Sequence, residues 1–494
     1  MNNKTGRPIL IILIAVAIIA GVSLLPLAEW SGGKLKNFSL VSDVQKVVAE
    51  DAPADSTEVT DDIDPELLEA MAAEVGDAVV NGTPAPHPLT APDSVLAQSI
   101  DTIISEPKPS RSGDLVVIED YSASGLGLVQ LRNAINSGRL ARIAVVGDSY
   151  IEGDIFTQDF RELMQSAYGG EGVGFVNMHS DFPGFRRSVK QGGKGWKTYL
   201  ANKKDARRDY IDLAEQYAMP TGDATSTYQG TKAFTHTGSW AVSRMLFIAP
   251  EGAEISVKAG QSDWQTHNIE ASPDVKCIEV ASATSDFQVK TSTRSLIGLG
   301  VWLDGLSGVS VDCMSSRGFS GITLTKVNPE LCRQMSTDVD YNLIILEFGI
   351  NALSASQSNY SLYCTRMVEV INHVRRCYPR ADILLMGIGD RGMKRGGAVV
   401  SMPTAAAMVS AQRDAARRAH CLFWDTREAM GGDGAVVEWC RSGLVNKDYI
   451  HMTHKGGARL AKALFAAVQA SLNHASPAPA FGADTAEGSP FQAL

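Results

Sequence analysis

The sequence predicts an α/β domain built on a parallel sheet, with helices on both faces. Short apolar runs, typical of strands buried on both sides, occur at 142–147, 341–349, 381–387 and 421–425. Stretches with apolar residues at helical spacing follow at 365–378, 404–419 and 455–472. Ligands of such sheets bind beyond the carboxyl ends of the strands, so we expect the functional residues there.

The alternation of strands and helices is interrupted between residues 185 and 310, which we expect to form an inserted β-sandwich. Four tryptophans of the chain lie in this region, where they either stack on sugar rings or fill the core of the sandwich. The α/β domain then comprises 121–184 and 311–473. Short Thr- and Ser-rich runs predict strands at 232–237, 239–248, 254–259, 275–280, 287–291 and 298–303.

The N-terminal segment carries a predicted transmembrane signal anchor at 9–28, preceded by a cytoplasmic stub at 1–8. Its 20 uncharged residues would form a helix of about 30 Å, the thickness of a bilayer's hydrocarbon core. Lys4 and Arg7 precede it and favour a cytoplasmic amino end. The alternative is a cleaved signal peptide, after which the protein is secreted. In both cases the rest of the chain is exported.

The acidity of the chain is concentrated in one segment. Residues 41–120 hold 18 acidic and three basic residues, whereas the whole chain has a formal net charge of −10. High like charge with few apolar residues predicts a disordered linker over 29–120. The segment 474–494 is also expected to be disordered. Because nucleic-acid binders are basic, this composition argues against nucleic acid as a partner.

Candidate catalytic residues follow the predicted strands or precede the last helix. Ser149 comes directly after the run 142–147, where its hydroxyl would reach the carboxyl edge of the sheet. Asp448 precedes His451 by three residues, a spacing at which the carboxylate can orient the imidazole toward a serine. A His-x-x-His spacing with His454 would also suit a metal, although no further ligand cluster accompanies it. Taken singly, each of these segments also suits a plain turn or a helix cap.

Two further strand ends supply candidate donors to an oxyanion. Gly349-Ile350-Asn351 follows the second apolar run, and the Asn351 amide could donate there. Gly318-Phe319-Ser320-Gly321 follows the run 308–313 and brings the backbone close, through Gly321 or, as the alternative, Gly318.

The order Ser149, Gly321, Asn351 and Asp448–His451 resembles the blocks of the SGNH (GDSL-type) hydrolase family. The resemblance implies a three-layer α/β/α, flavodoxin-like fold and a serine esterase mechanism without cofactor or metal. It makes Ser149 the nucleophile, His451 the general base and Asp448 its orienter. The oxyanion hole would comprise Ser149, Gly321 and Asn351. One departure is Ala352, where the family commonly has Asp.

The inserted β-rich region and the exported context resemble bacterial envelope O-acetylesterases within this family, such as peptidoglycan O-acetylesterases. This resemblance implies removal of O-acetyl groups from a cell-envelope glycan by an enzyme anchored in the bacterial inner membrane. Its catalytic domain would lie in the periplasm or outside the cell. The alternatives are an O-acetyltransferase that uses the same triad, a lipase or phospholipase, and a non-catalytic glycan-binding protein. The sequence leaves the oligomeric state and the disulfide pairing open.

Overall fold

The computed structural model describes residues 108, 110–181, 183–315 and 318–473 of the chain. The predicted anchor at 9–28, its stub at 1–8, most of the predicted linker and the tail at 474–494 lie outside the described residues. None of the helices in the described part of the chain combines the length and the apolar character that a bilayer span requires.

A six-stranded sheet lies at the centre of the α/β region, and five of its strands are parallel. The four strands predicted from apolar runs all belong to it. The sheet is formed by β3 (Glu119–Asp120), β4 (Ala141–Gly147), β14 (Val309–Ser315), β15 (Leu343–Glu347), β16 (Asp382–Met386) and β19 (Leu422–Trp424). Their order is β14-β4-β15-β16-β19-β3, and β3 runs antiparallel at the edge.

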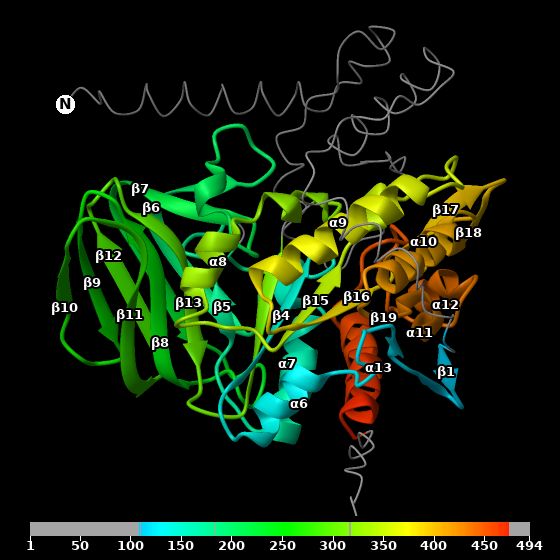
Figure 1. Ribbon diagram of the computed structural model, residues 1–494, viewed down its shortest axis with the longest axis horizontal. Helices are drawn as coiled ribbons and strands as arrows, with labels where there is room; N and C mark the ends of the chain where they lie inside the picture. Colours follow the sequence, from blue (N-terminus) through cyan, green and yellow to red (C-terminus); the bar gives the residue numbers. More distant parts are fainter. Residues whose placement is uncertain (1–107, 109, 182, 316–317, 474–494) are drawn as a thin grey trace, which may run out of the picture. The chain divides into compact units, whose positions relative to one another are not determined.

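Helices cover both faces of this sheet, which makes the region a three-layer α/β/α structure. They are α6 (Val129–Asn136), α7 (Thr157–Tyr168), α8 (Pro329–Met335), α9 (Ser361–Cys377), α10 (Ala405–Arg418), α11 (Thr426–Met430), α12 (Ala435–Arg441) and α13 (His454–Asn473). Alternate residues of each strand enter separate cores, as the two-residue period of a strand requires. On β15, Leu343 packs with α6, α7 and α13, whereas Ile344 packs with α8, α9 and α10. Figure 1 shows α9 and α10 on one side of the sheet and α7 and α13 on the other.

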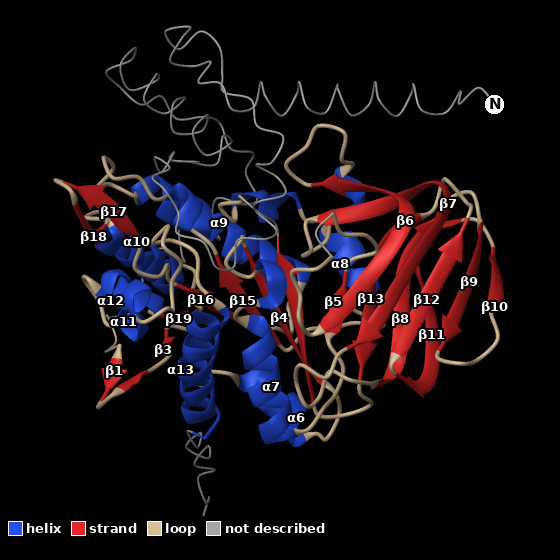
Figure 2. Cartoon of the chain, turned by 180° about the vertical axis from the view of Figure 1, so that it is seen from behind, coloured by secondary structure: helices blue, strands red, loops and turns tan. Residues whose placement is uncertain are grey.

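The region predicted as a β-sandwich is an antiparallel sheet of nine strands, gathered side by side in Figure 2. They are β5 (Gly174–Val176), β6 (Val189–Leu200), β7 (Gln216–Gly230), β8 (Trp240–Ala249), β9 (Ala253–Ala259), β10 (Gln265–Ile269), β11 (Ser272–Thr284), β12 (Asp286–Thr291) and β13 (Ile297–Asp304). The halves β10-β9-β12-β7-β6 and β5-β13-β8-β11 join through one pair, Gly298 and Ala218. Side chains of both halves, such as Phe287 and Phe247, share one hydrophobic core.

Several sequence expectations for this region are corrected. Residues 232–237 form turns and not a strand. The sequence does not predict the long strands β6 and β7, because most of their residues are only partly buried or exposed and glycines interrupt their alternation. The strand β5 lies before residue 185 and yet pairs with β13. Trp240 and Trp302 are fully buried, whereas Trp264 is exposed.

The end of the predicted linker is also ordered. Residues 110–120 carry β1 (Arg111–Ser112), β2 (Leu115–Val116) and β3, of which β3 pairs with β19. Glu119 is buried, and its carboxylate accepts hydrogen bonds from Arg413 and from the hydroxyl of Tyr121. The acidic composition of 41–120 gives no sign of this short strand, because an average charge does not show that one acidic residue, Glu119, pairs with Arg413.

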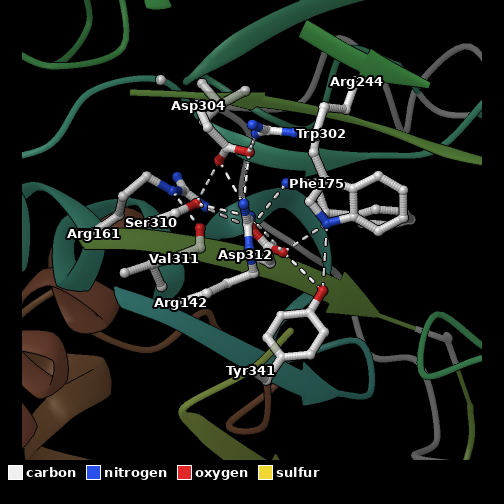
Figure 3. Close-up of polar contacts among 12 residues, drawn as sticks. Arg142, Arg161, Phe175, Arg244, Trp302, Asp304, Ser310, Val311, Asp312 and Tyr341 are labelled. Atoms are coloured by element: carbon white, nitrogen blue, oxygen red, sulfur yellow. Dashed lines mark hydrogen bonds and ion pairs between the residues drawn. The ribbon is translucent and has the colours of Figure 1, made fainter. Parts of the chain in front are cut away.

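A buried polar network joins the two sheets at Arg142 of β4 (Figure 3). The Arg142 guanidinium donates to Asp304 at the end of β13 at 2.8 Å and to Asp312 of β14 at 3.3 Å. Asp312 also accepts from the indole N–H of Trp302 and the hydroxyl of Tyr341, both at 2.8 Å. Burial raises the pKa of Asp312, although Arg142 opposes that shift. The strand that leads to Ser149 is therefore bonded to the antiparallel sheet.

We expect Arg142→Met to lower the free energy of unfolding by about 3–5 kcal/mol, because Asp312 loses the cation that it pairs with and Asp304 keeps only the longer contact with Arg244, at 3.6 Å. The control is Arg366→Met, which removes an exposed pair with Glu369 and should change stability by less than about 1 kcal/mol. Urea denaturation followed by tryptophan fluorescence measures both. Equal losses in the two variants would contradict the role assigned to Arg142.

Candidate active site

Ser149 lies in the turn that follows β4, at the carboxyl edge of the parallel sheet. The turn is tight, since a Cβ at Gly147 would lie only 2.7 Å from the backbone oxygen of Glu347 on the neighbouring strand. Asp148 Oδ1 accepts a hydrogen bond from the backbone N–H of Tyr150 at 2.9 Å, which fixes the turn. Asp148 and Tyr150 are buried, whereas Ser149 between them is only half-buried.

His451 and Asp448 share the loop between α12 and α13. Asp448 Oδ1 accepts from the backbone N–H groups of Ile450 and His451, at 2.9 and 3.0 Å, and Oδ2 lies 2.9 Å from His451 Nδ1. A carboxylate is only an acceptor, so Nδ1 carries the hydrogen. In the neutral ring Nε2 then presents its lone pair, and it lies 3.4 Å from Ser149 Oγ.

The carboxyl of Asp448 has a pKa below its usual value. Partial burial raises this pKa, but the hydrogen bonds from the His451 side chain and the Ile450 N–H lower it by more. The carboxylate therefore stays ionised at neutral pH and continues to accept from Nδ1 as the pH falls toward the ordinary aspartate range.

Asn351 lies near Ser149, but its amide already has acceptors. It belongs to the short 3₁₀ helix Ile350–Ala352 that follows β15. Its Nδ2 donates to Asp148 Oδ2 at 2.8 Å and to the backbone oxygen of Phe319 at 2.9 Å. An amide nitrogen carries two hydrogens, so a reacting oxyanion would have to share one of them. The departure Ala352 is buried at the end of this helix.

The two candidate glycines of the second block occupy different places. Gly318 lines the cavity in front of Ser149, and a Cβ on it would have nothing within 4 Å. Gly321 is buried, with φ of 89°, and a Cβ on it would lie 2.8–3.0 Å from the Phe348 side chain. The backbone near the cavity is thus that of Gly318, while Gly321 permits the close turn behind it.

A cavity of about 520 Å³ opens in front of Ser149 and His451, and Asn351 and Gly318 also line it. The buried Arg391, which sequence reasoning missed, is another lining residue, and its Nη1 donates to the backbone oxygen of Ile350 at 3.2 Å. Arg391 follows β16, so the strand-end rule that identified Ser149 could also have identified it. The structure thus brings together side chains from three strand ends and the loop before α13.

A second residue missed from the sequence is Glu347, the last residue of β15 and the partner of Gly147 in the sheet register. It is buried, and its Oε2 has no hydrogen-bond partner among the described residues. Burial raises the pKa of Glu347 well above its usual value, and the nearby Asp148 carboxylate raises it further. A charged residue that ends an apolar run was the available signal.

The His-x-x-His spacing does not assemble a metal site among the described residues, where no group of three or more His, Cys, Asp or Glu side chains is arranged to hold an ion. His451 Nδ1 faces Asp448, and His454 Nδ1 lies 3.0 Å from Gln158 Nε2. The two imidazoles therefore have different partners.

We expect Gly147→Ala to destabilise the protein and to displace Ser149. The added Cβ would meet the Ile151 side chain at 2.4 Å and the backbone of β15 at 2.7 Å, and a strand backbone cannot move aside cheaply. Gly222→Ala is the control, because a Cβ there has nothing within 4 Å. Thermal denaturation of both variants measures the difference, and an unchanged melting temperature for Gly147→Ala would be the contrary result.

Comparisons with known proteins bear on the family and the fold. Residues 285–459 match the GDSL-like Lipase/Acylhydrolase family. No curated protein sequence matches the chain. The structure of a peptidoglycan O-acetylesterase is similar in fold, with a TM-score of 0.61 and 20% sequence identity over 72% of this chain and 99% of the other. A family two carbohydrate esterase from Cellvibrio japonicus matches at a TM-score of 0.25 and 10% identity, over 57% of this chain and 98% of that one.

Proposed function

We propose that this chain, whose residues 285–459 match the GDSL-like lipase/acylhydrolase family, is a carboxylic ester hydrolase that removes O-acetyl groups from a cell-envelope glycan through an acyl-enzyme. The observation that carries the proposal is the line of polar atoms from Asp448 through His451 to Ser149. Such a line activates a hydroxyl that is otherwise a weak nucleophile.

The reaction proceeds in two halves. Ser149 Oγ attacks the acetyl carbonyl while His451 Nε2 takes its proton, and Asp448 stabilises the imidazolium that forms. The tetrahedral intermediate then expels the sugar oxygen, which receives the proton from His451, and acetyl-Ser149 remains. Water attacks this ester with His451 again as the base, and acetate leaves with return of the serine.

The charge on the carbonyl oxygen is stabilised by groups that surround Ser149. We assign this role to the backbone N–H of Ser149, the backbone N–H of the Gly318–Gly321 segment and the Asn351 amide. Because Gly318 lines the cavity, its N–H is the better placed of the two glycines. Donors aimed at a developing charge typically contribute several kcal/mol of transition-state stabilisation.

The substrate class is supported by how open the site is. The His451 side chain is 49% exposed and that of Asp448 42%, so an ester carried on a bulky polymer can reach Ser149. Water reaches the same atoms, which favours hydrolysis over acyl transfer. The fold likeness to a peptidoglycan O-acetylesterase makes an acetylated peptidoglycan the first substrate to test. The apolar segment 9–28 supports a membrane-anchored enzyme that acts outside the cytoplasm.

We expect Ser149→Ala to lower acetate release by at least about 10⁴-fold while the protein remains folded. Acetate released from O-acetylated peptidoglycan, xylan and 4-nitrophenyl acetate is measured beside circular dichroism. Ser410→Ala, an exposed serine on α10, is the control and should match the unaltered chain. Full activity of Ser149→Ala would refute the assignment. Transfer of acetyl to an added glycan, or faster cleavage of long-chain esters, would instead favour a transferase or a lipase.

We expect Asn351→Ala to lower kcat for 4-nitrophenyl acetate by about 10²–10³-fold and to leave KM nearly unchanged, because the amide bonds the substrate's carbonyl oxygen only once charge develops there. Steady-state kinetics separates the two parameters. A rise in KM at constant kcat would show that Asn351 binds the ground state and does not stabilise the oxyanion.

A further inference from the structure

A second cavity of about 360 Å³ adjoins the catalytic cavity, and Gly153 and Phe185 line both. Its walls come from the segment after β5, from β6 and β7, and from the loop after β14. Phe319 of that loop forms part of the wall, and its backbone oxygen accepts the hydrogen bond from Asn351 Nδ2. A molecule in the second cavity would therefore lie directly beside the groups that act on the ester.

The wall formed by β6 depends on an irregularity in that strand. Successive residues of a regular strand point to opposite faces. Gln191 and Thr198 are an odd number of residues apart, so on a regular strand their side chains would point to opposite faces. Both nevertheless line the same cavity. Between them Gly195 has φ of 78°, and the pairing with β7 shifts register between Lys194 and Trp196. Bulges that re-aim side chains are typical beside functional sites.

Three of the five residues by which β6 and β7 line the cavity are neutral and polar, and the other two are Val189 and Leu200. Gln191 and Thr198 of β6 and Gln216 of β7 carry amide or hydroxyl groups, and Gln216 lies opposite Leu200 in the register. The ionisable side chains of the wall have polar partners, since Arg186 lies 3.6 Å from Asp154, which also bonds Arg161 at 2.8 Å, and Asp181 lies 3.2 Å from the imidazole of His179. Such a lining suits a neutral ligand with many hydroxyl groups better than an ion.

Phe185 adds an aromatic ring to the lining, which also includes aliphatic side chains such as Val189 and Leu200. Its side chain is 44% exposed at the edge shared by the two cavities. A pyranose ring has an apolar face as well as hydroxyl groups, so an aromatic ring beside amide side chains matches both of its parts.

We propose that the second cavity binds the neutral sugar next to the acetylated one, so that the enzyme recognises at least two linked sugars. This inference rests on the proposed function, because the catalytic cavity must hold the acetylated unit. It identifies the substrate class as an oligosaccharide or polymer with a neutral sugar beside the acetylated one, and it assigns Gln216 and Thr198 to specificity and not to chemistry.

The test compares three acetyl esters with the full chain: O-acetylated N-acetylglucosamine, O-acetylated chitotriose and 4-nitrophenyl acetate. We expect kcat/KM for the trimer to exceed that for the monomer by at least about tenfold. Gln216→Ala should lower the ratio of kcat/KM for the trimer to that for 4-nitrophenyl acetate by about fivefold, the effect of one lost hydrogen bond. Gln216→Trp, which fills the cavity, should lower that ratio further, mainly through KM.

The control is Gln265→Ala on β10, an exposed glutamine outside both cavities, which should leave the ratio unchanged. Thr198→Val gives a second, nearly isosteric variant. Equal kcat/KM for monomer and trimer, or unchanged ratios in the Gln216 and Thr198 variants, would overturn the second cavity's role. Failure of the proposed function is a different result: no acetate from any acetylated sugar, or 4-nitrophenyl acetate cleavage that does not depend on Ser149.

Discussion

The relative placement of the two sheets depends on the hydrogen bonds and ion pairs that the Arg142 guanidinium makes. It donates to Asp304, the last residue of β13 in the antiparallel sheet, and to Asp312 of β14, the strand beside β4 in the parallel sheet. Trp302 donates its indole N–H to the same Asp312, so an apolar core and a charged network meet at one carboxylate. Burying the Arg142 guanidinium without these carboxylates would cost several kcal/mol. Arrangements of the two sheets that separate Arg142 from Asp304 and Asp312 are therefore disfavoured. Because β4 carries Arg142 and ends beside Ser149, the junction also fixes where the nucleophile stands relative to β6 and β7.

The parallel sheet then accounts for the site. Its strands end at one edge, and the segments that follow β4, β14, β15 and β16 supply Ser149, Gly318, Asn351 and Arg391. The imidazole comes from elsewhere, on the loop before α13, where three hydrogen bonds to Asp448 hold it. In the reaction that we propose, rigid strands position the groups that stabilise charge, while a local loop places the base. Partial exposure of that loop would keep water near the proposed acyl-enzyme, as hydrolysis requires.

The sequence predicts the parallel strands because burial on both faces gives them continuous apolar runs. It predicts the long helices because burial of one face gives them apolar residues at helical spacing. It fails for β6 and β7, where exposed faces and glycines such as Gly195 dilute the alternation, and for 232–237, where alternating residues lie in turns. Candidate site residues followed from strand ends, and the structure places Ser149, Asp448 and His451 in contact. Gly318 and Gly321 could not be separated, because only the fold shows which of them reaches the cavity. The second cavity depends on a register shift between distant strands, for which one chain's sequence holds no local signal.

The buried carboxyl of Glu347 shows how the fold limits negative charge beneath the nucleophile. Asp148 accepts hydrogen bonds from Tyr150 and Asn351, so its carboxylate has partners. Among the described residues no cation pairs with Glu347 beside it, and burial raises the pKa of Glu347 well above its usual value, which favours its protonated, neutral form. A second negative charge at this depth would destabilise the oxyanion of the proposed reaction at Ser149, because water does not screen the charge there. A neutral Glu347 therefore fills the end of β15 with a polar group and leaves the potential at the carbonyl oxygen to be set by Asn351 and the backbone N–H groups.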